Sequence, residues 1–499
     1  MLSAHTYHGI ILSMPAKSPA KPDLLLGIDQ GTSGNTVLVI DRDLAVIAHA
    51  TVGFTQHYPQ PGWVEHAPDE IWASLRAALR LALDGIDPTR LAALGITNQR
   101  ETTFVWDSDS GESLGNAIVW QDRRTSDWCE QHKALEADTR ARTGLPIDPY
   151  FSASKLAWLQ QHHGGRKLGF GTADTHLLRR LSGQHLTDRS NASRTLLLDI
   201  ASAQWCDELT RRFGVADIQL PRLASSSGVC ARVHDVPELP DGLPIAGIAG
   251  DQQAALFGQG CFDAGQSKIT YGTGSFILLN TGNTPVPSRH GMLSTIAWQI
   301  DQRTTYALEG GAYIAGALVA WLRDGLGIIE HAGQIEALAA SVPDSGGVTI
   351  IPAHAGLGAP HWRPQARGLI HGLSGGSTRA HLARAALEAI AHSQCDILEA
   401  MAADMGAPLR DIRVDGGAAA NNLLLQMQAD LAGVTLHRPR MLETTALGAA
   451  MLAGLGVGMW SGLDELRRAY VPERSFTPQA HRADVDAARS HWHQVLALA

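Results

Sequence analysis

The chain has 499 residues, of which 44% are hydrophobic, a length and composition typical of a globular protein with two or three domains. Its 40 Lys and Arg residues against 49 Asp and Glu residues give a formal charge of −9, which argues against binding to nucleic acids or membrane surfaces. The five cysteines form no CxxC pair, and their low, odd number favours a reducing cytoplasm over secretion.

Residues 1–22 are expected to form a disordered N-terminal extension. They lack the positively charged segment and the long apolar run of a signal peptide, and residues 15–22 are rich in Ala, Lys and Pro. Two starts of translation stay open, Met1 and Met14.

Short apolar segments separated by a polar turn predict a β-meander at the start of the folded chain. Strands are expected at residues 24–27, 35–40, 44–52, 91–96 and 102–106. A turn rich in Gly, Thr and Ser occupies residues 29–34. A helix is predicted from Pro68, because Pro is tolerated in the first turn and Asp69 and Glu70 favour the positive end of the helix dipole.

A related pattern recurs in the second half of the chain. Strands are predicted at residues 267–271 and 275–280, joined by a glycine-threonine turn at 272–274 that is similar to residues 31–33. Two copies about one domain apart indicate duplicated α/β domains whose hairpins face each other. The boundary is placed near Gly260.

A third glycine-rich turn occupies residues 413–418, after a strand and before a helix that carries Asn421 and Asn422. Its exposed backbone N–H groups could meet a nucleotide, although a DGG sequence is also common in plain turns. The chain contains no GxxxxGK[ST] phosphate-binding loop.

One uncharged stretch, residues 444–463, imitates a membrane span in length. Its five glycines and two leading threonines dilute the hydrophobicity, so we predict a closely packed internal helix that ends in a glycine turn, and no integral membrane span.

Several sequence blocks, taken in order, resemble the FGGY carbohydrate kinases, and among them the enzymes that phosphorylate glycerol. The blocks are residues 27–32 (GIDQGT), 58–66 (YPQPGWVEH), 95–103 (GITNQRETT), 117–121 (AIVWQ), 147–152 (IDPYFS) and 247–259 (GIAGDQQAALFGQ), while residues 150–162 and 368–388 resemble the two family signatures. The resemblance runs from Leu24 to Leu466. It implies an α/β fold of two actin-like (ribonuclease H-like) domains that face each other across a catalytic cleft. Residues 23–260 would bind the acceptor and phosphates, and residues 261–499 the nucleotide.

The resemblance also implies a reaction, the ATP- and Mg²⁺-dependent phosphorylation of glycerol to sn-glycerol 3-phosphate. The enzyme would act in cytoplasmic glycerol catabolism as a dimer or tetramer. Two alternatives stay open: a kinase for another small polyol or sugar, and a non-catalytic actin-fold sugar sensor. The presence of Asp29 and Asp251 speaks against the sensor, which needs neither carboxylate.

Site residues follow from the same resemblance. Glycerol would contact Arg100, Glu101, Trp120, Tyr150, Asp251, Gln252 and Phe276; ATP or ADP would contact Thr32, Ser33, Thr273, Gly316, Gly417 and Asn421; Mg²⁺ would be oriented by Asp29. Asp251 would be the general base that accepts the hydroxyl proton during in-line transfer.

Three of these assignments have structural alternatives. Asp29 could be an Asx-type turn residue. Arg100 and Glu101 could form an exposed surface ion pair. Asp251 could be the N-cap of a helix over residues 253–257.

Some positions depart from the family pattern. Thr36 stands where these kinases usually carry Arg, Ala320 replaces a Gln near the adenine, and Arg363 replaces an Asp. Residues 226–243 lack the glycine-rich basic loop that binds fructose 1,6-bisphosphate in regulated bacterial members, so this compound is expected to have little effect.

Overall fold

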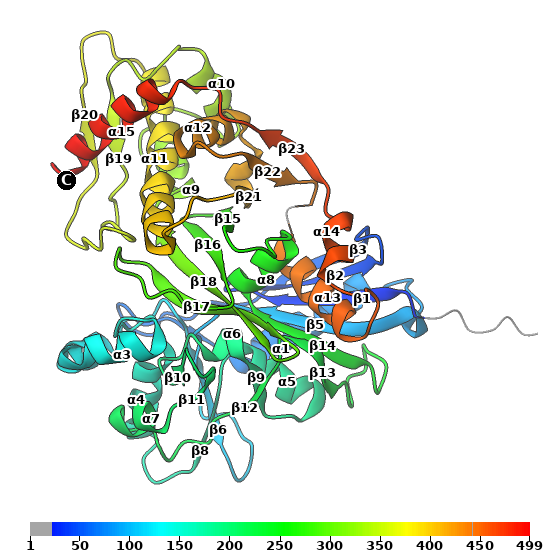
Figure 1. The fold of residues 1–499 in the computed structure, drawn as a ribbon. Coiled ribbons are helices and arrows are strands. Elements are labelled where there is room, and N and C mark those ends of the chain that lie inside the picture. The colour runs from blue at the N-terminus through cyan, green and yellow to red at the C-terminus, as the bar shows by residue number, and fades with distance from the viewer. Residues whose placement is uncertain (1–21, 442) are drawn as a thin grey trace, which may run out of the picture.

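The computed structural model describes residues 22–441 and 443–499. The extension expected over residues 1–22 therefore lies, except for Pro22, outside the described residues. The first element described is a strand, β1 (Leu24–Gln30), which is part of the central sheet (Figure 1).

A mixed sheet of 13 strands runs through the whole molecule. Its order is β23 (Pro472–Phe476), β22 (Leu436–Pro439), β21 (Asp411–Asp415), β15 (Gln266–Tyr271), β16 (Ser275–Gly282), β18 (Arg303–Ala312), β17 (Leu293–Ile300), β13 (Ser227–Arg232), β14 (Pro244–Gly250), β5 (Leu91–Asn98), β1 (Leu24–Gln30), β2 (Gly34–Asp41) and β3 (Val46–Gly53). Short strand pairs lie outside it: β4 (Glu65–His66) with β7 (Ala117–Ile118), β6 (Phe104–Asp107) with β8 (Leu168–Gly171), β9 (Leu186–Asp188) with β12 (Arg222–Ala224), β10 (Leu198–Asp199) with β11 (Gln204–Trp205), and β19 (Thr349–Ile351) with β20 (Leu369–His371).

Helices pack against both the first and the second half of this sheet. They are α1 (Pro68–Ala82), α2 (Ser126–Gln131), α3 (Glu136–Thr143), α4 (Ser152–His162), α5 (Ala173–Ser182), α6 (Arg189–Ala192), α7 (Asp207–Arg212), α8 (Asp251–Gly258), α9 (Gly316–Asp324), α10 (Gln334–Ala340), α11 (Arg379–Met405), α12 (Asn422–Ala432), α13 (Thr444–Gly456), α14 (Leu463–Ala469) and α15 (Arg482–Leu496), with 3-10 helices at Pro88–Arg90, Lys133–Leu135 and Gly417–Ala420. The helix predicted from Pro68 begins there, with Asp69 and Glu70 in its first turn.

The two halves of the sheet repeat one pairing pattern, which confirms the predicted duplication. In the first half, β1 pairs antiparallel with β2 and parallel with β5. In the second half, β15 pairs antiparallel with β16 and parallel with β21. One residue pair, Ser227 with Ile300, joins the halves through β13 and β17. The division proposed at Gly260 falls between α8 and β15 and stays a prediction.

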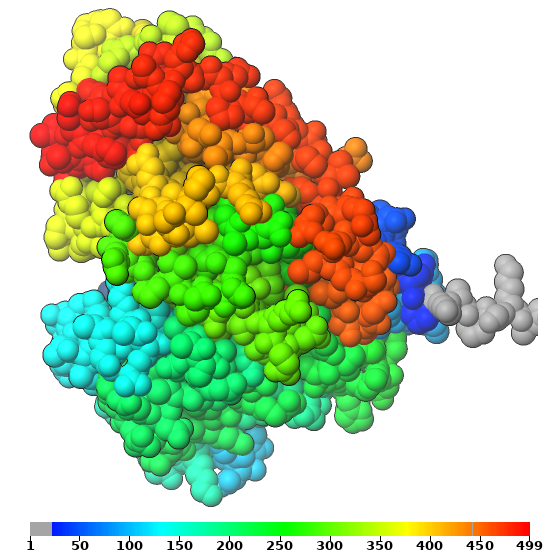
Figure 2. Space-filling model, viewed as in Figure 1, coloured from blue at the N-terminus to red at the C-terminus, as the bar shows by residue number. Residues whose placement is uncertain are grey.

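The two halves form two lobes. In Figure 2, yellow and red residues of the C-terminal part gather in one lobe and cyan and green residues of the first half in the other, while the orange-red residues of α13 and α14 lie beside the first half. The chain crosses back once, because α13 follows the second half in sequence but packs on β1, β5 and β14 of the first half.

Small residues let α13 lie close to this sheet. A Cβ at Gly27 would overlap Ala446 O, and one at Gly95 would overlap Ala449 O. Gly458, with φ of +75°, follows the helix in the left-handed conformation that glycine favours. The prediction of a closely packed internal helix is confirmed, and in the described part of the chain no helix combines the length and apolar character needed to cross a membrane.

Two predicted strand starts were wrong because turns occupy them. The strand expected from Leu44 begins at Val46, since Leu44 has φ of +61° in the preceding turn. The strand expected from Thr102 begins at Phe104, since the chain turns through Arg100 and Glu101 after β5.

Candidate functional site

The turn after β5 carries two buried charges. Arg100 and Glu101 are only 3% and 1% exposed, so the surface ion-pair interpretation is wrong. Glu101 has φ of +61°, a left-handed conformation rare for a residue with a side chain, and its carbonyl accepts a hydrogen bond from Ser152 Oγ at 3.0 Å. Backbone strain of this kind clusters at active sites and ligand-binding positions.

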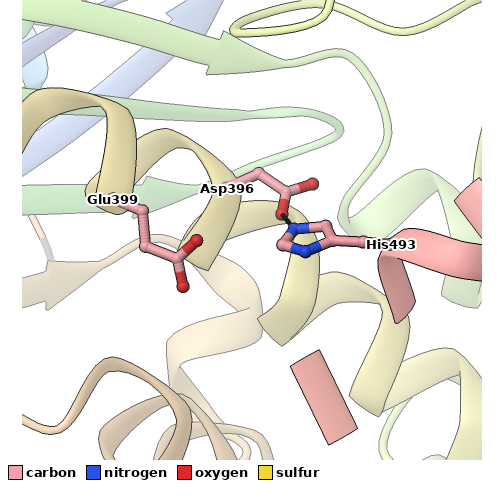
Figure 3. A group of neighbouring side chains, drawn as sticks. All are labelled: Asp396, Glu399 and His493. Atoms are coloured by element: carbon pink, nitrogen blue, oxygen red, sulfur yellow. Dashed lines mark hydrogen bonds and ion pairs between the residues drawn. The ribbon is translucent and has the colours of Figure 1, made fainter. Parts of the chain in front are cut away.

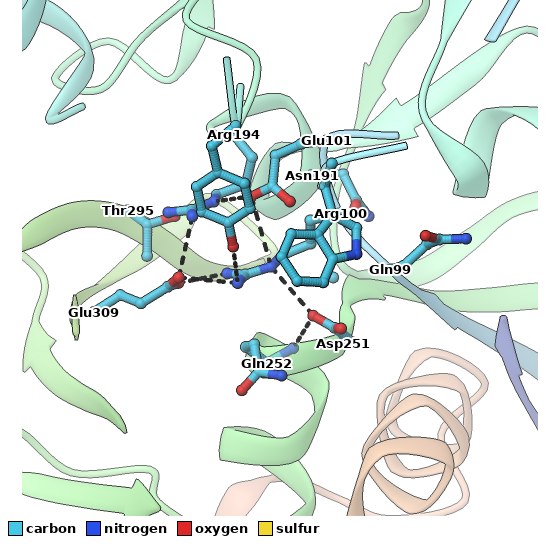
Figure 4. Close-up of polar contacts among 12 residues, drawn as sticks. Gln99, Arg100, Glu101, Asn191, Arg194, Asp251, Gln252, Thr295 and Glu309 are labelled. Carbon is cyan, nitrogen blue, oxygen red and sulfur yellow. Dashed lines mark hydrogen bonds and ion pairs between the residues drawn. The ribbon is translucent and has the colours of Figure 1, made fainter. Parts of the chain in front are cut away.

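Arg100 lies at the centre of the site (Figure 4). Its Nη1 and Nη2 donate to the carboxylate of Glu309 at 2.5 and 2.9 Å, and its Nε lies 3.1 Å from Asp251 Oδ1. Tyr150 adds its hydroxyl at 3.4 Å from Nη2. Burial lowers the pKa of Arg100, but the surrounding acidic groups hold it well above the ordinary value. One guanidinium therefore joins the β5 turn, β18 and the start of α8.

Asp251 is the first residue of α8, and Gly250 occupies the N-cap position. The N-cap interpretation of Asp251 is therefore wrong by one residue, although its Oδ1 accepts a hydrogen bond from Gln252 N at 2.6 Å. The side chain is 28% exposed, so solvent or an acceptor can reach it. Burial raises the pKa of Asp251 above its ordinary value, while Arg100 and Lys268 act against the rise. A carboxylate with a raised pKa is a better proton acceptor.

Gln252 is oriented by a buried lysine that the sequence analysis missed. Lys268 Nζ donates to Gln252 Oε1 and, at 2.7 Å, to Thr270 Oγ1. Because an ammonium group only donates, the amide oxygen of Gln252 faces Lys268 and the amide nitrogen is turned away from it. The signal in the sequence was a lysine within the predicted strand at 267–271, four residues before Gly272 of the second hairpin.

The predicted aromatic residues are placed differently from one another. Trp120 Nε1 donates to Thr32 Oγ1 at 3.0 Å, and the rings of Trp120 and Tyr150 meet edge to face with centroids 5.6 Å apart. Trp120 thus links the acceptor residues to the first hairpin. Phe276 is half-buried on β16, opposite Thr270 of β15, on the side of the second hairpin.

Asp29 lies within strand β1, so its interpretation as a turn residue is wrong. Its Oδ1 is buried and has no hydrogen-bond partner in the described part of the chain. Burial, followed by the charges of Asp251 and Glu443, raises the pKa of Asp29 well above its ordinary value. An unpartnered carboxylate oxygen beside a second carboxylate is a donor set that suits Mg²⁺, which prefers oxygen ligands.

Three of the predicted nucleotide residues, Thr273, Gly316 and Gly417, lie at the second hairpin or at the sheet edge beside it, whereas Thr32 and Ser33 lie on the first hairpin. The N–H groups of Ala315 and Ala317 donate to Thr273 O at 2.9 Å, and the N–H of Gly316 donates to Gly272 O at 2.9 Å. Gly417 follows β21, which lies parallel to β15, and a Cβ there would meet open space. The N–H groups of residues 315–317 are used within the fold, and the exposed residues here are Gly272, Thr273 and Gly417, where backbone is accessible to a phosphate.

Asn421 has a structural role besides the predicted one. It is the N-cap of α12, and its Oδ1 accepts a hydrogen bond from Leu424 N at 2.9 Å. On the first hairpin, Ser33 is exposed and Thr32 is half-buried under Trp120.

Two of the three departures have visible partners. Thr36 Oγ1 lies 2.9 Å from Thr51 Oγ1, across the β2–β3 pair. Arg363 Nη1 donates to Leu496 O at 3.2 Å and ties its loop to the end of α15. Ala320 is half-buried on α9, next to the second hairpin.

A second acidic cluster, formed by Asp396, Glu399 and His493, has the spacing of a metal site (Figure 3). Arg489 already occupies it, since its Nη2 donates to Asp396 at 2.6 Å and to Glu399 at 2.9 Å. The guanidinium supplies the positive charge that a metal would bring. The cluster therefore anchors α15 on α11 and is separate from the site around Arg100.

The site residues named above lie in a chain with many relatives. The N-terminal domain of the FGGY family of carbohydrate kinases matches residues 24–258, and the C-terminal domain of the same family matches residues 267–457. The glycerol kinase of Myxococcus xanthus is 52% identical over 474 residues, which cover 92% of this chain and 96% of that protein. The glycerol kinase of Aromatoleum aromaticum is 53% identical over 485 residues, 95% of this chain and 98% of that protein.

A solved structure agrees with the sequence relatives. The glycerol kinase of Plasmodium falciparum, crystallised with ADP, superposes with a TM-score of 0.90 at 33% identity, covering 95% of this chain and 97% of that one. Two domain matches, near-complete relatives and the two-lobed fold all point to one family. The chain belongs to the FGGY family of carbohydrate kinases.

Proposed function

We propose that this protein transfers the γ-phosphate of ATP to glycerol and releases sn-glycerol 3-phosphate and ADP. The observation that carries the proposal is the convergence of the buried Arg100 and Glu101 with the partly exposed carboxylate of Asp251. Glycerol has three hydroxyls and little apolar surface, so a selective site needs paired donors and acceptors. The relatives of about half identity over nearly the full length are named glycerol kinase, which supports the same substrate.

Asp251 is the proposed general base. Its carboxylate accepts the proton of the primary hydroxyl as that oxygen attacks the γ-phosphorus in line, while Arg100 donates to, and Glu101 accepts from, the remaining hydroxyls. Gln252 presents its amide nitrogen, because Lys268 holds the oxygen. Positioning of this kind supplies most of the catalysis in phosphoryl transfer.

The phosphates are held by the two hairpins in this proposal. Thr32 and Ser33 act from the first lobe and Thr273 from the second, with Gly316, Gly417 and Asn421 around the rest of the nucleotide. Mg²⁺ held at Asp29 through water would neutralise charge on the transferred phosphate. We place the reaction in cytoplasmic glycerol catabolism, carried out by a dimer or tetramer.

The test is ADP release with Mg-ATP over a panel of glycerol, erythritol, ribitol and xylulose under matched conditions. We expect glycerol to give the highest kcat/KM and the product to be the sn-3 ester. Equal or faster turnover of a longer acceptor would mean that this polyol, and not glycerol, is the substrate. Binding of a polyol without any ADP release would favour the sensor.

A further inference from the structure

Four buried side chains of alternating charge, two of them the proposed acceptor residues Arg100 and Glu101, form a closed ring (Figure 4). Arg100 pairs with Glu309, and Glu309 Oε1 accepts from Arg194 Nη2 at 3.1 Å. Arg194 Nε donates to Glu101 Oε1 at 2.7 Å, and Arg100 Nε lies 3.9 Å from the same oxygen. Each member is at most 3% exposed, so the ring is neutral as a whole and shielded from water.

Two members of this ring, Glu309 and Arg194, belong to neither the predicted acceptor residues nor the nucleotide residues. Arg194 follows α6 in the first lobe, whereas Glu309 lies on β18, which belongs to the second half of the sheet. On β18, Glu309 stands opposite Leu278 of β16 and Leu293 of β17. A carboxylate between two leucines would be unfavourable without its two arginines.

Stability alone does not account for the ring. Buried ion pairs can often be replaced by apolar residues without loss of stability, so the ring is weak evidence for a purely stabilising role. Glu309 accepts one hydrogen bond from each terminal nitrogen of Arg100, which fixes the guanidinium with its Nε edge toward Asp251 and leaves a second N–H on each terminal nitrogen. Arg194 takes one oxygen of Glu101, which leaves the other for a ligand.

We infer that Glu309 and Arg194 are positioning residues of the acceptor site: Glu309 fixes the guanidinium plane of Arg100, and Arg194 fixes the carboxylate of Glu101. The inference rests on the proposed function in one respect, that Arg100 and Glu101 bind the acceptor hydroxyls. Because Glu309 comes from the second half of the sheet, the acceptor site is complete only when β18 is in place. Both halves of the duplicated fold thus contribute to acceptor recognition.

Glu309→Gln is the first test, because Gln keeps the shape and one acceptor but loses the charge. Charge-assisted hydrogen bonds correspond to about a 10- to 100-fold change in an equilibrium constant. We therefore expect KM for glycerol to rise by about that factor, with KM for ATP changed by less than about threefold. A general loss that changes both KM values and kcat alike would instead assign Glu309 a structural role and overturn the inference.

Arg194→Lys is the second variant, because it keeps the charge and removes the planar fork that spans Glu101 and Glu309. Circular dichroism and a thermal melt show whether each variant folds. If Glu309→Gln does not fold, Arg194→Lys still tests the inference. We expect the same selective rise in KM for glycerol. A KM for glycerol within about threefold of wild type in either folded variant overturns the inference.

Asp396→Asn is the matched control, since Asp396 is another buried carboxylate paired with an arginine, at 2.6 Å from Arg489, but in the other lobe. It should lower the melting temperature and leave KM for glycerol unchanged. Wild-type protein is assayed first on the polyol panel. If another polyol is the substrate, the variants are measured with that polyol, so the proposed function can fail while the positioning roles are still tested.

Discussion

Asp251 combines an accessible carboxylate with a raised pKa at the start of α8. Asp251→Asn keeps the shape and the position at the helix start but cannot accept a proton. We expect kcat at saturating glycerol and ATP to fall about 10²- to 10⁴-fold, with little change in the melting temperature. Nucleotide affinity, measured by calorimetry, should persist because the hairpins are unchanged. A variant that retains more than about a tenth of wild-type kcat would reject Asp251 as the base.

The same variant has a signature in the pH profile. Asp251 accepts a proton only when it is ionised, and burial raises its pKa above the ordinary value, so activity should be lost at a higher pH than an exposed aspartate would give. On falling pH, kcat/KM for wild type should decline through that raised pKa. The residual activity of Asp251→Asn should lack this decline. If the variant loses activity at low pH as the wild type does, the decline belongs to the titration of another group.

At this scale the sequence predicted the residues that carry local motifs and missed those that act across the fold. Arg100, Glu101 and Asp251 stand in recognisable blocks, and the structure places Arg100 Nε 3.1 Å from Asp251 Oδ1 and 3.9 Å from Glu101 Oε1. Glu309 and Arg194 meet Arg100 and Glu101 only through sheet pairing and helix packing. The lone hint was an acidic residue in the apolar stretch of β18, which local propensity cannot interpret.

Among the elements, α13 shows how small residues position the site. Gly95 of β5 lies against Ala449 of α13, and β5 leads directly into the turn with Arg100. Gly95→Ala would force the helix away from the strand, a form of overpacking that typically costs about 1–3 kcal/mol. We expect a lower free energy of unfolding in denaturant melts, together with a raised KM for glycerol because the turn shifts.

Gly375→Ala, in a turn between β20 and α11, is the control for the Gly95→Ala substitution. A Cβ at Gly375 would meet nothing within 4 Å, so its effect on the free energy of unfolding should stay within about 0.5 kcal/mol. If Gly95→Ala is as stable as this control, the close approach of α13 to β5 is not what holds the turn.

Elements that depend on local sequence were the ones predicted well. Turn residues predicted the two hairpins, helix-start residues predicted α1, and a lack of charge predicted the internal helix α13. No local pattern indicated what α13 packs against. This helix follows the second half of the sheet in sequence but packs on strands of the first half. Such crossings depend on the complementary surfaces of distant segments, here glycines on three strands facing the small residues of one helix.

For the whole molecule, the distribution of site residues predicts closure on ligand. The ring around Arg100 is buried and already joins both halves of the sheet, whereas Ser33 and Thr273 at the tips of the two hairpins are exposed. A reaction in which both hairpins contact the phosphates of one nucleotide requires the two lobes to approach each other, while the buried ring around Arg100 stays in place. The single residue pair between β13 and β17 is the weakest point of the sheet and suits a hinge.

Small-angle scattering of the full chain tests this motion. The radius of gyration should fall when glycerol and a nonhydrolysable ATP analogue are both present with Mg²⁺, and less with either ligand alone, because only the ternary complex engages both hairpins. Asp251→Asn, which lacks the base but keeps both hairpins, should compact as wild type does. Thr273→Ala, which removes one hydroxyl from the second hairpin, should need more nucleotide to reach the same radius. An unchanged radius in the wild-type ternary complex would show that the lobes are already closed, and the exposed hairpins would then have to meet the phosphates without domain motion.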